Sequence, residues 1–366
     1  MAAAETKEEF VVVVGETETR TPIFSVLAKR TYQIEPGRPA RRKPAATPLA
    51  RVDVYYDHGD PESSTVKFEN DLAPYKLKTD VVLIGQAHAP GWNPTTQMAV
   101  GLAVGDHRKV IHVIGDRRCV HRADQPPTFT DPEPFTRMEI RYERAYGGMY
   151  LRDDPARMWA YPRNHHGVGF VLKNTREAID GLALPNLEDP DDLLTPERIV
   201  LDEPERWNGQ PLPQGFGWFQ RTWYPRCSFV GAVPGFVDPD EVMREETLGL
   251  VPAGQIALAR RLKLPGFDVR FNNGASPGLA LPHLTGGELV RLRNLTPEGS
   301  LDFSLPNETP VMTLDIGLGE NALKPVLHTV CIRVEEREVD LVWRGAHPFP
   351  GIDWLPEMTR LTAVVA

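Results

Sequence analysis

Two adjacent histidines, His165 and His166, form the one histidine pair of the chain, and imidazoles are frequent ligands of catalytic metal ions. Together with a carboxylate they would suit a metal-assisted hydrolase, in which the metal activates water. Adjacent side chains on a strand point to opposite faces, however, and a helical pair needs a spacing of four residues. No Cys or Glu lies at a zinc-like interval, so we interpret the pair first as loop residues bonded to backbone. The hydrolase stays as an alternative.

A general base with an orienting carboxylate is a second possible arrangement, with His88 beside Asp80 or Asp116. The sequence offers no serine in a strand–turn–helix elbow to act as the nucleophile. We expect the two aspartates to accept hydrogen bonds from backbone donors at strand ends and turns, with Lys76 and Arg117 as ion-pair partners. We therefore assign no catalytic residues and expect a protein that is not an enzyme.

Two glycine clusters, Gly147-Gly148 and Gly167-Val168-Gly169, have the backbone freedom to cradle a phosphate group. Neither is followed by Gly-Lys-Ser/Thr, and neither lies between a predicted strand and a helix. Turns that need a positive φ explain these glycines. The sequence therefore predicts no nucleotide site, and we expect no cofactor and no metal ion.

Five aromatic side chains crowd one short stretch of the chain: Phe216, Trp218, Phe219, Trp223 and Tyr224. Trp and Tyr bury a large area at a small entropic cost, which suits a hot spot for a protein partner. The same cluster would equally anchor a hydrophobic core. A third interpretation is a β-sandwich carbohydrate-binding module that uses Trp218 and Trp223. We name the five as candidate partner-binding residues and leave the other two interpretations open.

The charge balance limits the classes of partner. The 366 residues include 41 Lys and Arg against 50 Asp and Glu, a formal net charge of −9. This excess argues against nucleic acid and against an anionic membrane surface. No apolar run is long enough to span a bilayer, and the N-terminal residues do not resemble a signal peptide. Three scattered cysteines, Cys119, Cys227 and Cys331, predict no disulfide framework, so we expect a cytoplasmic protein.

The elements that must position these residues are mainly β-strands. Long helices do not tolerate 35 prolines, whereas short strands joined by turns do. Three valine-rich segments, at 78–85, 98–104 and 109–114, predict strands, and Gly105-Asp106 predicts a tight hairpin between the last two. The best helix candidate is 253–262, which follows a proline and contains Ala, Leu and Arg.

The length of the chain exceeds one comfortable hydrophobic core. We therefore predict a mainly β fold with two β-rich, sandwich-like lobes and one or two short helices. Residues 1–180 would form the N-terminal lobe and 213–366 the C-terminal lobe. Between them, 181–212 has few periodic apolar runs and several prolines, which indicates a long irregular connection.

Several short segments, in a fixed order, are spread through most of the chain. They lie at 71–91, 113–117, 131–135, 142–148, 184–188, 215–217, 267–272 and 288–306, and the set closes on Trp343-Arg344-Gly345. In this order the segments resemble the bacterial family called domain of unknown function 2169, over roughly residues 20–345. No single motif is diagnostic, whereas the ordered set is specific.

Members of that family resemble adaptors of the bacterial type VI secretion system. The resemblance implies a bacterial cytoplasmic chaperone-like protein that holds a toxic effector, often one with a spike-tip domain, and helps to load it onto the spike protein. It implies neither catalysis nor secretion of the adaptor itself. The chain departs from the family pattern at 164–170 and at 241–263, so the identity of the effector does not carry over.

Overall fold

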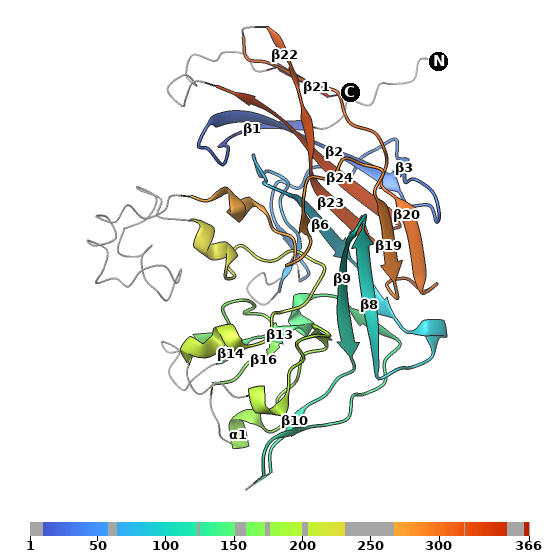
Figure 1. Ribbon diagram of the computed structural model, residues 1–366, viewed down its shortest axis with the longest axis vertical. Helices are drawn as coiled ribbons and strands as arrows, with labels where there is room; N and C mark the ends of the chain where they lie inside the picture. Colours follow the sequence, from blue (N-terminus) through green and yellow to red (C-terminus); the bar gives the residue numbers. More distant parts are fainter. Residues whose placement is uncertain are drawn as a thin grey trace, which may run out of the picture.

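The computed structural model describes residues 10–57, 64–122, 125–150, 159–172, 176–199, 204–230, 267–317, 319–349 and 362–365. In these residues strands far outnumber helical segments, which confirms the predicted mainly β class (Figure 1). The predicted helix at 253–262 lies outside the described residues.

The largest sheet joins segments from both ends of the chain in one layer. Its seven strands are β1 (Phe10–Glu16), β2 (Pro22–Gln33), β24 (Glu338–Pro348), β23 (Pro325–Arg333), β6 (Thr79–Ile84) and β18 (Ala280–Leu281) in spatial order, with β3 (Arg41–Arg42) paired to β2. All neighbours are antiparallel except β6 and β23, which run parallel with Thr329 opposite Asp80. The strand predicted at 78–85 is therefore confirmed.

The second sheet contains the predicted hairpin. Its five strands are β17 (Leu187–Glu188), β9 (His107–Ile114), β8 (Gln97–Val104), β19 (Leu289–Arg293) and β20 (Ser300–Ser304) in spatial order. Gly105 has a φ of 56°, the left-handed conformation that the tight turn between β8 and β9 requires. Val100, Leu102 and Val104 are buried and alternate with more exposed neighbours, so one face of this sheet is apolar.

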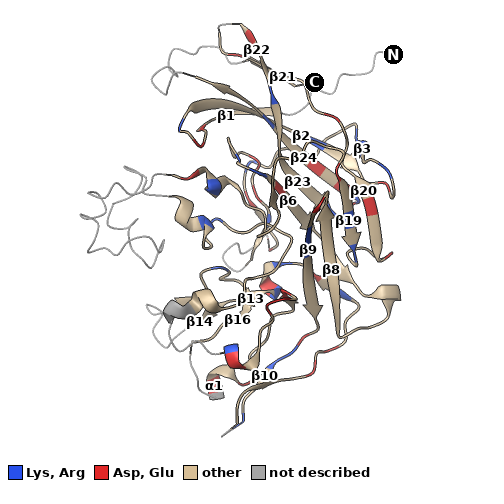
Figure 2. Ribbon diagram, in the orientation of Figure 1, with Lys and Arg blue, Asp and Glu red and all other residues tan. Residues whose placement is uncertain are grey.

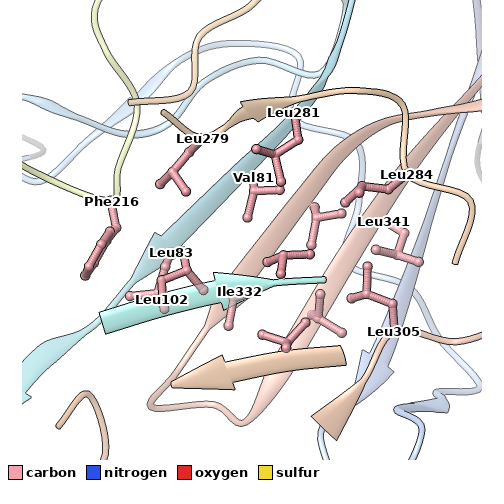
Figure 3. Close-up of a cluster of buried hydrophobic side chains, with 14 of the residues drawn as sticks. Val81, Leu83, Leu102, Phe216, Leu279, Leu281, Leu284, Leu305, Ile332 and Leu341 are labelled. Atoms are coloured by element: carbon pink, nitrogen blue, oxygen red, sulfur yellow. The ribbon is translucent and has the colours of Figure 1, made fainter. Parts of the chain in front are cut away.

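The apolar face of the second sheet packs on one face of the largest sheet, as in a β-sandwich. Figure 3 shows Leu102 of β8 close to Leu83 of β6 and Ile332 of β23, with Leu341 of β24 in the same cluster. All four are almost completely buried. Because burying one such side chain contributes about 1.5–3 kcal/mol, this core is the main source of stability for the scaffold.

The opposite face of the largest sheet is also covered, but by polar and charged groups. Lys29 of β2 donates to Asp71 at 2.9 Å, and Lys76 donates to Asp80 of β6 at 2.7 Å. On β24, Asp340 accepts from Thr31 at 2.5 Å. Since buried charges need partners, these bonds explain how the segment before β6 lies on the sheet without unpaired charge.

Shorter elements complete the described structure. A three-stranded sheet contains β22 (Glu320–Leu323), β21 (Met312–Asp315) and β25 (Thr362–Val365). Two-stranded pairs are β4 (Val54–Tyr55) with β5 (Val66–Phe68), β7 (Gln86–His88) with β12 (Arg137–Glu139), β10 (Cys119–Val120) with β11 (Thr128–Phe129), β13 (Tyr146–Gly147) with β16 (Val168–Gly169), and β14 (Met149–Tyr150) with β15 (Trp159–Ala160).

In the part of the chain that the structure describes, helical segments are short, as the proline content predicted. The α-helix is α1 (Arg176–Ile179), and the 3-10 turns are η1 (Pro90–Trp92), η2 (Tyr142–Arg144), η4 (Pro196–Arg198), η5 (Pro204–Gly209), η6 (Arg226–Val230) and η8 (Val269–Asn272). A second hydrophobic cluster forms around Tyr146, Tyr161 and Ile179. In Figure 1 the green part of the chain, with β10, β14, β16 and α1, lies beyond one end of the two large sheets.

Both large sheets combine strands from distant parts of the chain. The largest sheet pairs β2 with β24, and the second pairs β8 with β19, so each takes strands from both sides of 181–212. That connection also contributes a strand, because β17 pairs with β9. Pairing between strands this far apart in the sequence is not encoded in local patterns.

Candidate functional site

A pocket of about 510 Å³ lies where the second sheet meets the cluster around Tyr146 and Tyr161. We call it the charged pocket. It is lined by four segments, 116–118, 130–133, 141–144 and 183–186, together with Val168. Figure 2 shows acidic and basic residues close together beside β13, in this part of the molecule. Its volume lies within the range of ligand-binding clefts, which favour junctions between packed units.

Asn186 forms the floor of the charged pocket. Its Nδ2 donates to the carbonyl of Ile114 and to Asp116 Oδ1, both at 2.9 Å, and its Oδ1 accepts from Arg144 Nη1 at 3.2 Å. The backbone also joins these segments, since Asn186 N–H donates to the Arg144 carbonyl at 2.8 Å. One buried amide therefore fixes the relative positions of three lining segments.

An ion pair supports one wall of the pocket. Arg117 Nη2 donates to Glu188 Oε1, and Glu188 Oε2 accepts from the backbone N–H of Leu194 at 2.7 Å. Burial raises the pKa of Glu188 above its usual range, against the opposing effect of Arg117. The same guanidinium donates to the Pro185 carbonyl at 3.2 Å, so Arg117 is held on two sides.

The segment at 130–133 closes against the end of β9. A Cβ at Gly115 would lie 1.8 Å from the Glu133 carbonyl oxygen, so this close approach requires glycine. Thr130 and Arg118 exchange backbone and side-chain hydrogen bonds, and Arg118 Nη1 donates to the Gly181 carbonyl at 2.9 Å. These bonds place the exposed carboxylates of 130–133 on the rim of the pocket.

The remaining wall comes from η2 and the residues before it. Glu143 accepts from the Thr65 backbone N–H at 2.7 Å and from Thr65 Oγ1 at 2.8 Å, which ties η2 to β5. Arg141 lies 3.2 Å from Glu139 and stacks over Tyr56, with 5.7 Å between the guanidinium carbon and the ring centroid. The pocket thus combines both signs of charge on walls fixed by hydrogen bonds.

The predicted pairing of Lys76 with Asp80 is confirmed. Asp80 also accepts from the backbone N–H groups of Gly274 and Ala275, at 3.0 and 3.2 Å, which is the predicted role of satisfying backbone donors. The predicted pairing of Arg117 with Asp116 is wrong, because Arg117 pairs with Glu188. The chain turns after β9, and Asp116 points to Asn186 instead.

The structure does not bring the sequence-predicted base and carboxylates together. His88 lies in β7, where its ring meets the Trp92 ring edge-on with 5.8 Å between centroids. Within the described residues no hydrogen bond or ion pair joins it to Asp80 or Asp116. Burial lowers the pKa of His88, which weakens it as a base.

The histidine pair lies in the turn before β16. Burial, reinforced by His166, lowers the pKa of His165 to about 4, so this imidazole is neutral at pH 7. The backbone N–H of His166 donates to Asn164 Oδ1 at 3.2 Å, and its ring centroid lies 6.2 Å from that of Trp223. Among the described residues, no group of three or more His, Cys, Asp or Glu is placed to bind a metal ion.

The neighbouring glycines have the turn role predicted for them. Gly148 and Gly169 adopt positive φ values of 118° and 96°. A Cβ at Gly147 would lie 2.2 Å from the Asn164 carbonyl oxygen, which is closer than any side chain permits. Close packing of β13 on β16 therefore explains these glycines.

The five candidate aromatic residues divide into two groups. Phe216, Trp218, Phe219 and Trp223 are each at most 5% exposed, whereas Tyr224 is 41% exposed. Trp223 packs edge-on against Tyr142 and Phe219, with ring centroids 5.0 and 5.1 Å apart. The four buried rings thus serve the core, the second of the interpretations left open. A partner that approaches this segment meets Tyr224, which packs on Trp207.

Sequence reasoning did not single out the residues of the charged pocket as a site. Arg118, Arg141 and Arg144 each lie in a short polar segment that reads as an ordinary turn. A signal was present, however, because four of the segments that carry the family resemblance, at 113–117, 131–135, 142–148 and 184–188, all contribute to the pocket lining. Their convergence is visible only in three dimensions.

Comparisons with known proteins gave one match. A family described as "Uncharacterized protein conserved in bacteria (DUF2169)" matches residues 19–344, which is most of the chain. No match was found among curated proteins or among solved structures. Within the described residues, no helix is both long enough and apolar enough to cross a membrane.

Proposed function

Because the chain belongs to the DUF2169 family of bacterial proteins, we propose that it has the role that the family resemblance implies. It is an adaptor of type VI secretion that binds a toxic effector in the bacterial cytoplasm. It holds the effector, or the spike-tip domain of that effector, and helps to load it onto the spike protein. The adaptor makes and breaks no covalent bond in this process.

The observation that carries this proposal is the charged pocket. Four segments shared with the family pattern converge on it, and hydrogen bonds donated by Asn186, Thr65 and Arg118 fix its walls. A preformed polar surface suits a binding protein, because little conformational entropy is lost when a partner docks. The β-sandwich behind the pocket supplies the rigidity.

The pocket alone is smaller than a stable protein interface, which buries at least about 1,000 Å². The contact surface therefore extends beyond it. Tyr224 is the exposed member of the candidate aromatic set, and its contact with Trp207 gives it a rigid position. Tyr side chains of this kind are frequent hot spots, so we propose Tyr224 as a second contact of the effector.

Co-purification tests the proposal directly. The tagged chain is expressed with the effector encoded beside it, and the complex is isolated by affinity and size exclusion. We expect the effector to co-purify and its loading onto the spike to be lost when the adaptor is deleted. The proposal fails when no effector co-purifies and toxin delivery is normal without this protein.

The two alternative functions have weaker support. A metal-assisted hydrolase would use His165 and His166, but the described residues place no third ligand with them. A carbohydrate-binding module would stack sugars on Trp218 and Trp223, but both indoles are buried, so neither presents a face to a glycan. Stoichiometric zinc that is lost on replacement of both histidines by alanine would revive the hydrolase.

A further inference from the structure

We propose that the charged pocket takes a basic segment of the partner, with Lys or Arg side chains that enter between its rim carboxylates. This inference rests on the proposed function, because it names the chemistry of the partner segment. It follows from which charges of the pocket already have partners within the protein.

The arginines of the pocket are mostly neutralised from within. Arg117 pairs with Glu188, and Arg141 lies 3.2 Å from Glu139. Arg144 donates to Asn186 and lies 3.7 Å from Asp116. Each guanidinium is thus committed to a carboxylate of the same chain, so a partner's carboxylate would have to compete with an existing one.

Three of the four lining carboxylates have no such commitment among the described residues. The side chains of Asp131 and Glu133 are exposed and form no ion pair among the described residues. Among the described residues, the hydrogen bonds that Glu143 accepts come from the neutral Thr65. The side chain of Asp116 is 68% exposed, although Arg144 approaches it. Negative charge therefore faces the open side of the pocket.

The balance of charge points the same way. Four carboxylates line the pocket against four guanidinium groups, and two of these groups, Arg117 and Arg141, are paired with carboxylates outside the lining. Arg118, the guanidinium with a carbonyl rather than a carboxylate partner, lies exposed at the edge. The net charge of −9 adds a long-range field that favours cations. An extended Lys or Arg side chain matches this arrangement.

Short fluorescent peptides test the sign of the charge. One peptide is rich in lysine, one in glutamate and one is neutral, and their binding to the full chain is followed by anisotropy. We expect the lysine-rich peptide to bind more tightly than both others, and to weaken as salt is added. Equal binding of the lysine-rich and glutamate-rich peptides would overturn the inference.

Charge-neutral variants locate the binding. Asp131→Asn with Glu133→Gln should weaken the lysine-rich peptide about fivefold, since each rim pair contributes modestly. Arg118→Gln should strengthen it about twofold, because a repelling charge is removed. Asp106→Asn with Glu320→Gln makes the same charge change at exposed sites outside the pocket and should leave the affinity unchanged. If both double variants weaken the lysine-rich peptide equally, the peptide responds to the net charge of the protein and not to the pocket, and the inference fails.

The complex with the effector separates this inference from the proposed function. When the effector co-purifies with the wild-type chain but is retained equally by the Asp131→Asn, Glu133→Gln variant, the adaptor role stands and the basic segment is rejected. When no effector co-purifies, the adaptor role fails, and the peptide measurements still decide whether the pocket selects cations. Circular dichroism confirms that each variant is folded.

Discussion

Asn186 donates from Nδ2 to Asp116 Oδ1 at 2.9 Å, across the floor of the charged pocket. The two residues are far apart in sequence, and neither lies in a long element. The same nitrogen donates to the Ile114 carbonyl at 2.9 Å, so β9 and β17 are joined by a side chain as well as by backbone pairing. One amide therefore joins three of the segments that form the pocket.

Replacement of Asn186 by Ala should lower the free energy of unfolding by about 2 kcal/mol, because the buried Ile114 carbonyl loses its donor and the side chains of Asp116 and Arg144 lose a partner. It should also weaken capture of the effector, since Asp116 and Arg144 lose their common support. Urea unfolding and co-purification measure the two effects. Asn208→Ala, at an exposed residue, is the control, and an equal loss in both variants would contradict the role of Asn186.

A buried ion pair fastens the aromatic segment to the rest of the protein. Arg226 donates to both oxygens of Glu69, at 2.5 and 2.6 Å, and also to the carbonyls of Phe219 and Phe271. Both side chains are 4% exposed. Glu69→Gln should cost about 3–5 kcal/mol, because the guanidinium is left buried without its anion.

Urea unfolding of Glu69→Gln beside the wild type measures this loss, with exposed Glu320→Gln as the control. The pH dependence gives a second check. Burial disfavours the charged form of Glu69, but Arg226 and Arg221 outweigh it and lower its pKa. The pair thus stabilises the fold above the usual pKa of about 4.5 and is lost as the pH falls below it. In Glu69→Gln the free energy of unfolding should lack this acid-sensitive contribution.

Trp223 and Tyr224 should respond in opposite ways to truncation. Trp223→Ala removes a fully buried indole and should cost about 3–5 kcal/mol of stability. Tyr224→Ala removes a side chain that is 41% exposed, so stability should change little while effector capture weakens. Thermal unfolding and co-purification distinguish the pair. Full effector capture by Tyr224→Ala would remove Tyr224 from the interface.

Local patterns in the sequence predicted the strands well. The strands β8 and β9 and the hairpin at Gly105-Asp106 follow from valine-rich runs broken by turn residues. These features depend on neighbours in sequence, and the class of the fold follows from them. The abundance of proline likewise predicted short helical segments.

Local sequence patterns could not predict which distant strands pair with each other. The parallel contact of β6 with β23 places Asp80 opposite Thr329, and nothing in either segment encodes the other. The pairing of β2 with β24 and of β8 with β19, across residues 181–212, is likewise not encoded in local patterns. The charged pocket was missed for the same reason, because Arg118, Glu133 and Asn186 each look like isolated turn residues.

Lys109 of β9 offers a test that depends on pH. Its Nζ donates to Ser276 Oγ at 2.5 Å and to the Pro277 carbonyl at 2.9 Å, both neutral acceptors. Burial lowers the pKa of Lys109 from its ordinary value of 10.5 to about 7, against a weak opposing effect of Asp189. Between about pH 7 and pH 10.5, Lys109 is therefore deprotonated in the folded state and protonated in the unfolded state.

Because the unfolded state binds more protons in this window, the contribution of Lys109 to stability rises as the pH goes from about 7 toward 10.5. Lys109→Met removes the titrating group, so the gain in stability between about pH 7 and about pH 9 should be smaller than in the wild type. Urea unfolding at both pH values measures the difference. Lys324→Met, at an exposed lysine, should keep the wild-type slope. A Lys109→Met slope equal to that of the wild type would mean that Lys109 stays charged in the folded protein.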